Sequence, residues 1–189
     1  MTKGFGPDAV VAAAAAGCRA IGENYAQELV TKGPAAQAAG LAVHFIGQLQ
    51  TNKVRQLAGL VDVWETVDRP RLVVELGRRA PGSTVLVQVD TTGEEGKGGC
   101  PIAEVPALVR TATDAGLVVA GLMTVGPTDG GPEAARAGFR AVRALVDELG
   151  LTTCSMGMSA DLDVAVEEGT TEIRVGTGLF GLRPSHRRL

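Results

Sequence analysis

Apolar positions along the chain follow two alternating patterns. Short runs rich in Val, Ile and Thr, with the two-residue period of strands, alternate with longer stretches in which apolar residues recur at helical spacing. Pro stands at several predicted helix starts and Gly follows several ends. The predicted strands are residues 18–24, 42–48, 61–67, 83–90, 118–125, 152–158 and 172–178. The predicted helices include residues 7–17, 69–80, 101–116, 132–150 and 160–169.

This alternation predicts βαβ units and a parallel sheet. The residues "MTK", 1–3, fit the end of a further strand placed first. Eight such units close a (β/α)8 barrel of the TIM type. The alternative is an open doubly wound sheet, but no G-x-G-x-x-G follows the first full strand. We therefore predict one α/β domain, residues 1–189, folded as a TIM-type barrel that lacks most of its first strand.

The amino-acid composition indicates what the core consists of and in which cellular compartment the protein is expected. The chain is 45% hydrophobic but only 3% aromatic, so the core consists of Ala, Val, Leu and Ile. The net charge is −3, and the basic cluster 183–189, which contains His186, is interpreted as a solvated terminus and not as a nucleic-acid arm. Three widely spaced cysteines fit a reducing compartment. With no membrane span or signal peptide, we expect a cytoplasmic monomer without nucleic-acid or membrane partners.

Two segments of small residues follow the last two predicted strands. They are "SMGMSAD", residues 155–161, and "VGTG", residues 175–178. Free backbone N–H groups at such turns and at a helix start attract anions. Ser159 as a plain helix cap, with the glycines only permitting turns, is the alternative. Because barrels often bind phosphate at this corner, the paired loops favour a phosphate site.

Arg174 and Lys3 are predicted to place positive charge at the same end of the barrel, the mouth formed by the carboxyl ends of the strands. If Ile173 and Val175 face the helices, Arg174 points into the barrel, where it needs an acceptor. That acceptor is either Glu172 or a ligand. Lys3, at the end of the first strand, would project into the same mouth. An amine beside a phosphate pocket and an arginine suggests a Schiff base with pyridoxal phosphate, although a terminal lysine is often simply solvated.

Several longer motifs carry a resemblance to a known family. The motifs are "TKGFGPDAV", "IGENYAQEL", "HFIGQLQTNK", "GLMTVGP", "SMGMSADLDVAVEEG" and "EIRVGTGLFG". In these motifs the chain resembles the pyridoxal phosphate homeostasis proteins. The fold of that family is similar to the barrel domain of alanine racemase. The resemblance implies that Lys3 forms the Schiff base, that Asn24 approaches the 3-hydroxyl of the cofactor and that Arg174 faces its ring nitrogen. It also implies a phosphate site made of Ser155, Gly157, Ser159, Gly176 and Thr177.

The same resemblance implies a function without turnover: storing pyridoxal phosphate in the cell, with apo-enzymes as acceptors. A racemase-like enzyme is the main alternative. It needs an acid/base group on each face of the substrate carbon, and alanine racemase takes the second, a tyrosine, from an additional domain. The only tyrosine here is Tyr25. A sugar-phosphate enzyme would use Asp90 as its base.

Family members carry a helix and most of the first strand before the lysine, and this chain begins at Met1. We therefore expect exposed strand edges, a Lys3 held on a poorly anchored terminus and competition from the α-amino group of Met1 for the aldehyde. Residues 93–99, although Gly-rich, do not fit a P-loop and are interpreted as a mobile loop. His44 is either a cofactor contact or a core histidine.

Overall fold

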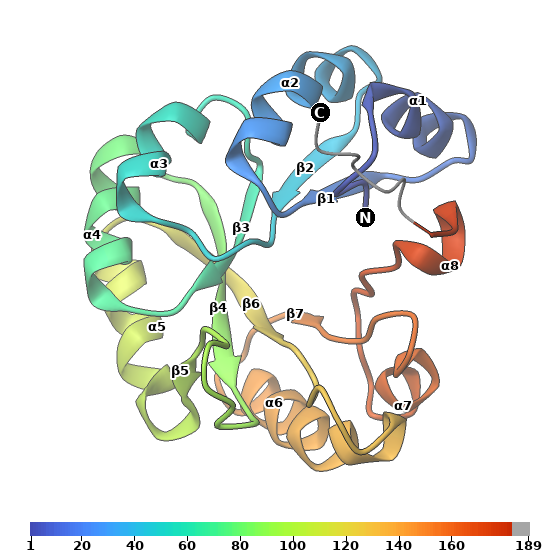
Figure 1. Ribbon diagram of the computed structural model, residues 1–189. Coiled ribbons are helices and arrows are strands. Elements are labelled where there is room, and N and C mark those ends of the chain that lie inside the picture. The colour runs from blue at the N-terminus through green and yellow to red at the C-terminus, as the bar shows by residue number, and fades with distance from the viewer. Residues whose placement is uncertain (183–189) are drawn as a thin grey trace.

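A parallel sheet wrapped by helices forms the body of the protein in the computed structural model, which describes residues 1–182 (Figure 1). The basic cluster 183–189 with His186 lies outside the described residues. The strands follow one another around the sheet in the order β1-β2-β3-β4-β6-β7, and β5 pairs with β4. They are β1 (Ala20–Glu23), β2 (Ala42–Phe45), β3 (Val63–Val67), β4 (Thr84–Asp90), β5 (Cys100–Pro101), β6 (Val118–Thr124) and β7 (Thr153–Ser155).

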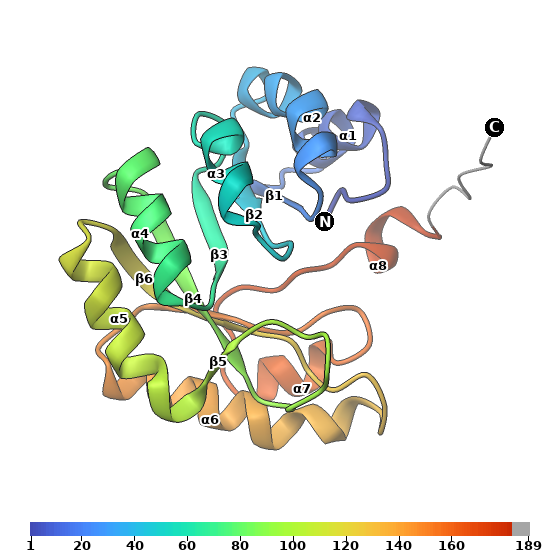
Figure 2. The same ribbon diagram turned by 60° about the vertical axis from the view of Figure 1, so that its left-hand side comes forward.

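Helices alternate with these strands and cover the outside of the curved sheet (Figure 2). They are α1 (Pro7–Ala15), α2 (Ala26–Ala38), α3 (Thr51–Leu57), α4 (Pro70–Arg79), η1 (Ile102–Glu104), α5 (Val105–Asp114), η2 (Pro132–Ala135), α6 (Arg136–Glu148), α7 (Leu162–Glu167) and α8 (Thr177–Phe180). Within residues 1–182 no helix is both long and apolar enough to cross a membrane. The predicted α/β fold with a parallel, barrel-like sheet is confirmed.

Strand alternation divides the sheet into an apolar outer face and a polar inner face. In β3, Trp64 is fully buried and its ring contacts that of Phe45, with 6.2 Å between centroids. The next residue, Glu65, is 1% exposed and belongs to a polar cluster inside the barrel. Because neighbouring strand residues point to opposite faces, the helices pack mainly on Val, Leu and Trp side chains, and the interior receives Glu65 and the polar groups that it contacts.

The predicted last strand, residues 172–178, does not form. Residues 172–175 are extended and join β7 through one isolated bridge, between Ser155 and Glu172. Thr177 already begins the short helix α8. A regular ladder needs a continuous neighbouring strand. On the far side of this segment, the hydrogen bond found among residues 1–182 is the one that the α-amino group of Met1 donates to the carbonyl of Val175 at 2.9 Å.

The N-terminal residues span the gap between β1 and the extended segment. Thr2 is fully buried and its N–H donates to the carbonyl of Gly22 in β1 at 3.2 Å. Phe5 packs on Phe180 of α8 with 5.4 Å between ring centroids. The expectation of a poorly anchored terminus is therefore wrong, because contacts on both sides hold it. Met1 and Thr2 together make a single rung across the opening.

Below this rung the expected opening is present. A cavity of about 480 Å³ lies between residues 19–22, around β1, and residues 171–174 of the extended segment. His44 and Glu65 line its inner side. The sheet is thus an incomplete barrel, closed at the rung and open beneath it.

Candidate functional site

A cavity of about 230 Å³ lies at the carboxyl-terminal mouth of the barrel, where the strands end. Five of the residues predicted from the sequence line it, together with Met1, Phe5, Ile46, Met158 and Ala160. The five are Lys3, Ser159, Arg174, Gly176 and Thr177. The fold therefore brings together the amine of Lys3, the guanidinium of Arg174 and two loops of small residues from opposite ends of the sequence.

The other predicted site residues lie nearby but outside this cavity. Asn24 lines an adjoining cavity of about 420 Å³, which shares Ile46 with the first. Ser155 is fully buried beneath the mouth. Gly157 has φ of 95°, and a Cβ there would come within 2.5 Å of the Cβ of Ala165, so the turn requires glycine.

A hydrogen bond connects the two small-residue loops. The hydroxyl of Ser159 accepts the N–H of Gly178 at 3.2 Å. Ser159 therefore contacts α8 and not the helix that follows it, where Asp161 is the N-terminal boundary residue. The N–H groups of Gly176 and Thr177 make no hydrogen bond within the described part of the chain. These unpaired donors beside a cavity are what an anionic group requires.

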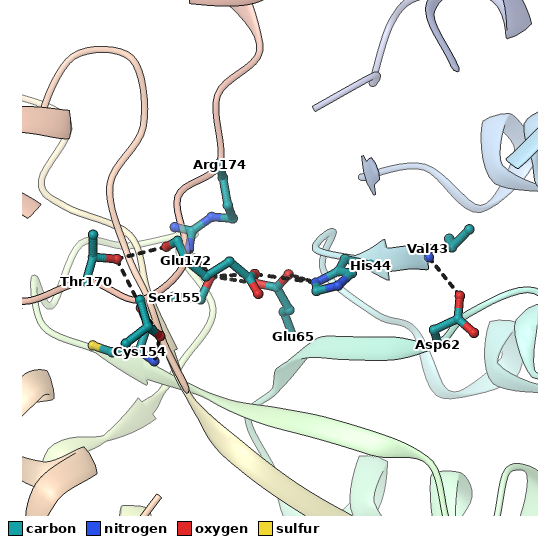
Figure 3. A network of polar contacts seen from close by, with 10 residues as sticks. Val43, His44, Asp62, Glu65, Cys154, Ser155, Thr170, Glu172 and Arg174 are labelled. Carbon is teal, nitrogen blue, oxygen red and sulfur yellow. Dashed lines mark hydrogen bonds and ion pairs between the residues drawn. The ribbon is translucent and has the colours of Figure 1, made fainter. Parts of the chain in front are cut away.

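Arg174 points into the barrel, as the alternation predicts, and is 6% exposed. Its Nη1 donates to Ser155 Oγ at 2.7 Å and its Nη2 to the carbonyl of Thr124 at 2.6 Å (Figure 3 shows Arg174 above Ser155). Among residues 1–182 it forms no ion pair, so the alternative of a partner in Glu172 is wrong. The acceptors are neutral oxygens, and the side chain remains part of the cavity wall.

Glu172 pairs instead with His44, inside the barrel (Figure 3). His44 Nδ1 lies 2.7 Å from Glu65 Oε1 and 3.4 Å from Glu172 Oε1, and Ser155 Oγ lies 2.8 Å from Glu65 Oε2. We call these four residues the His44 cluster. Its three ionisable groups lie within 4.8 Å of one another, as metal ligands do, but they already satisfy each other by hydrogen bonds.

Burial and pairing compete in setting the charges of the His44 cluster. Burial alone would lower the pKa of His44, but the hydrogen bonds to Glu172 and Glu65 raise it to about 10. Burial would raise the pKa of Glu172, yet the hydrogen bond from His44 brings it down to about 2. The pKa of Glu65 is raised, chiefly by its burial. His44 is therefore a charged core histidine, and Glu65 is a residue that the sequence analysis missed although its inward position was predictable.

A second polar cluster, also missed from the sequence, holds the N-terminal residues. Lys32 of α2 is 2% exposed, and its Nζ donates to the carbonyl of Thr2 at 2.7 Å. It also contacts Glu23 Oε1 at 2.9 Å and Glu28 Oε2 at 2.8 Å. We call Thr2, Glu23, Glu28 and Lys32 the Lys32 cluster. A single lysine in a helix carries no sequence signal that distinguishes it from a surface residue.

Residues 93–99, expected to be a mobile loop, are held over the neighbouring cavity. Gln48 donates to the carbonyl of Gly96 at 2.8 Å and Gln88 to that of Gly98 at 2.6 Å. Asp90 accepts from the N–H groups at the start of the loop, which lowers its pKa. Asp90 is thus a turn-forming residue with a weakly basic carboxylate, which does not suit a general base.

Comparison with known proteins adds an independent observation. The family model "Alanine racemase, N-terminal domain" matches residues 2–184. A pyridoxal phosphate homeostasis protein of Aquifex aeolicus is 42% identical over 178 residues, 88% of this chain and 78% of that protein. One of Pseudomonas aeruginosa is 39% identical over 182 residues, 93% of this chain and 79% of that protein.

A solved structure agrees with this relationship. PipY of Synechococcus elongatus, with PLP bound, superposes with a TM-score of 0.84 at 32% identity, over 95% of this chain and 90% of that one. Both the sequence matches and the shared fold extend over nearly the whole chain. The chain therefore belongs to the alanine racemase N-terminal domain family and, within it, to the pyridoxal phosphate homeostasis proteins.

Proposed function

We propose that this protein binds pyridoxal phosphate in the cavity of about 230 Å³ and takes part in its homeostasis in the cytoplasm. The observation that carries the proposal is the convergence of Lys3, Arg174 and two small-residue loops on this one cavity. The presence of PLP in the structure of PipY supports the same ligand class.

Each lining group has a role that follows from its chemistry. When bound, pyridoxal phosphate supplies an aldehyde that condenses with a primary amine and releases water. Lys3 would provide that amine. The N–H groups of Gly176 and Thr177 and the hydroxyl of Ser159 would hold the phosphate. Arg174, fixed from below by Ser155, would orient the ring.

Two further predicted residues, Asn24 and Gly157, have roles next to the cavity. Asn24, in the adjoining cavity, would contact the ring substituents on that side. Gly157 allows the turn that brings the first small-residue loop to the mouth, since its φ is 95°. Its carbonyl accepts the N–H of Arg174 at 3.0 Å, which ties the loop to the segment that carries the guanidinium.

The chemistry of the lining favours storage over turnover. A racemase needs a proton acceptor on each face of the substrate carbon. The ionisable groups lining the cavity are Lys3, Arg174 and the α-amino group of Met1, and Tyr25 is 52% exposed beside the neighbouring cavity. Hydrolysis of the lysine link would release the cofactor, and apo-enzymes that need it are the partners such a role implies. We propose that the protein does this as a monomer.

One experiment tests ligand and lysine together. Purified protein is incubated with pyridoxal phosphate, its visible absorbance is recorded before and after borohydride, and the trapped adduct is mapped by mass spectrometry. We expect the main adduct at Lys3, because the competing α-amino group of Met1 is held by the carbonyl of Val175 at 2.9 Å. Lys3→Ala removes the absorbance, whereas phosphate-dependent binding partly persists, and Lys53→Ala is the matched control. An adduct at Lys53 or Lys97 contradicts the assignment, and no uptake at all contradicts the function.

A further inference from the structure

Both peptide groups that flank Lys3 are held by one partly buried ion pair, Lys32–Glu28. The carbonyl of Thr2, which precedes Lys3, accepts from Lys32 Nζ at 2.7 Å. The N–H of Gly4, which follows Lys3, donates to Glu28 Oε2 at 2.8 Å. Lys32 Nζ and that same Glu28 oxygen lie 2.8 Å apart. The pair therefore contacts the backbone on each side of the Lys3 Cα.

The ion pair is itself held in place by β1. Glu23 has no exposed surface, and both its carboxylate oxygens contact Lys32 Nζ, at 2.9 and 3.1 Å. The hydroxyl of Thr2 also donates to Glu23. Burial raises the pKa of Glu23, whereas the hydrogen bonds from Thr2 and Lys32 oppose that rise. A strand, a helix and the N-terminal segment thus share one cluster in which a single ammonium group contacts two carboxylates.

Stability alone is a poor explanation for such an arrangement. Replacing a buried ion pair by apolar residues of similar size is often neutral or stabilising. What apolar residues cannot supply is a directed contact to a backbone carbonyl and to a backbone N–H. Such contacts fix the backbone at Lys3, whose segment, within residues 1–182, hydrogen-bonds to the sheet and the extended segment through the backbone groups of Met1 and Thr2.

We propose that Lys32, together with Glu28, is the positioning residue for Lys3: it fixes the two flanking peptides so that the Lys3 side chain enters the cavity at one defined point. This inference rests on the proposed function, because it assigns a purpose to the geometry of Lys3. Lys32 itself does not line the cavity, so it acts through the backbone and not on the ligand.

The mildest test changes Glu28, whose side chain is 26% exposed and outside the core. Glu28→Ala removes the acceptor for Gly4, and Glu28→Gln keeps an oxygen in its place. We expect Glu28→Ala to slow formation of the Lys3 adduct by about tenfold, since small displacements of a reacting group have large effects on rate. Glu28→Gln should restore most of the rate. Equal rates in both variants and the wild type overturn the inference.

A stronger test removes the Lys32–Glu23 pair so that Glu23 is not left as a lone buried charge, while Glu28, which is 26% exposed, keeps its carboxylate. The double variant Lys32→Met, Glu23→Gln replaces both charges by neutral groups of similar length. Val10→Ala, a buried truncation in α1 outside the cluster, is the control for general loss of stability. In the apo-protein, we expect faster amide hydrogen exchange over residues 1–5 in the double variant than in Val10→Ala. Unchanged exchange overturns the inference.

Ligand selectivity separates this inference from the proposed function. Pyridoxine 5′-phosphate has the ring and phosphate but no aldehyde. If Lys3 reacts, the wild type prefers pyridoxal phosphate over this analogue. We expect the double variant to lose that preference, to spread its trapped adducts over other amines and to keep its affinity for the analogue. No preference in the wild type refutes the proposed function, whereas a preference retained by the variant refutes only the positioning role.

Discussion

Two buried polar clusters border the N-terminal rung, and they differ in what they hold. The Lys32 cluster contacts backbone groups on both sides of Lys3. The His44 cluster contacts side chains and, through Ser155, reaches the guanidinium of Arg174. One cluster therefore fixes where the main chain lies, and the other fixes the direction of a single side chain. The Lys32 cluster lies between β1 and α2 and the His44 cluster lies inside the barrel, so polar contacts from opposite faces of the sheet hold the chain beside Lys3 and the side chain of Arg174.

The clusters also differ in their response to pH. The His44 cluster contains a histidine whose pKa rises to about 10 and a carboxyl whose pKa falls to about 2. Its contribution to folding is therefore largest between the ordinary values of those groups, 4.5 for glutamate and 6.5 for histidine. The contribution of Glu172 is lost as the pH falls from 4.5 to about 2, and that of His44 is lost as the pH rises from 6.5 to about 10.

The largest expected effect comes from breaking the Lys32 cluster on one side only. Lys32→Met leaves Glu23 buried without its cation, and we expect the free energy of unfolding to fall by about 3–5 kcal/mol. Urea denaturation measures it. The control is Arg143→Met, which removes an exposed pair with Asp147 and should change stability by no more than about 1 kcal/mol. Similar losses in the two variants would mean that the Lys32 pair behaves as a surface pair.

The His44 cluster should respond less strongly and with a pH dependence. His44→Gln removes the charge but retains a hydrogen-bonding group, so we expect a loss of about 2–4 kcal/mol at pH 6. The stabilising proton of His44 is fully bound below pH 6.5 and is lost as the pH rises to about 10. The difference in free energy of unfolding between His44→Gln and the wild type should therefore become smaller over that interval. A gap that stays constant from pH 6 to pH 10 would contradict the assigned charge of His44.

A substitution of Arg174 tests whether the side chain that the His44 cluster holds contacts the cofactor. Arg174→Gln replaces a charged donor that faces the cavity, and we expect weaker pyridoxal phosphate binding by about 1.5–3 kcal/mol and a shifted absorbance. A cofactor titration with spectra measures both. Unchanged affinity and spectrum would mean that the arginine serves the barrel interior alone. Lys53→Gln, away from the cavity, is the matched loss of one positive charge.

The smallest expected effect lies outside both clusters. Ser159→Ala removes one hydroxyl from the small-residue loops, and we expect pyridoxal phosphate binding to weaken by about 1 kcal/mol. Binding of pyridoxal, which has no phosphate, should stay the same. Equal losses for the two ligands would show that Ser159 acts only through its contact with Gly178.

Much of the fold could be predicted because local periodicity encodes it. Six of the predicted strands overlap observed ones, and Arg174 points inward as the alternation of Ile173 and Val175 indicates. The prediction failed for residues 172–178, which have a strand-like sequence but lack a continuous neighbour. Strand propensity describes a side chain on a pleated surface, and it does not supply the partner that completes the ladder.

The sequence by itself determined the order of elements, the polar inner face and the family, because periodicity and motifs are local properties of the chain. It also identified Lys3, Arg174 and the small-residue loops, since these stand at predicted strand ends. Only the tertiary structure decided which charges meet. Lys32 contacts the carbonyl of Thr2 because α2 packs against β1 beside the N-terminal segment, and His44 contacts Glu65 because the curved sheet turns β2 and β3 toward one interior. Which buried polar groups meet therefore depends on how helices pack on strands and how the sheet curves, and no short stretch of sequence contains either property.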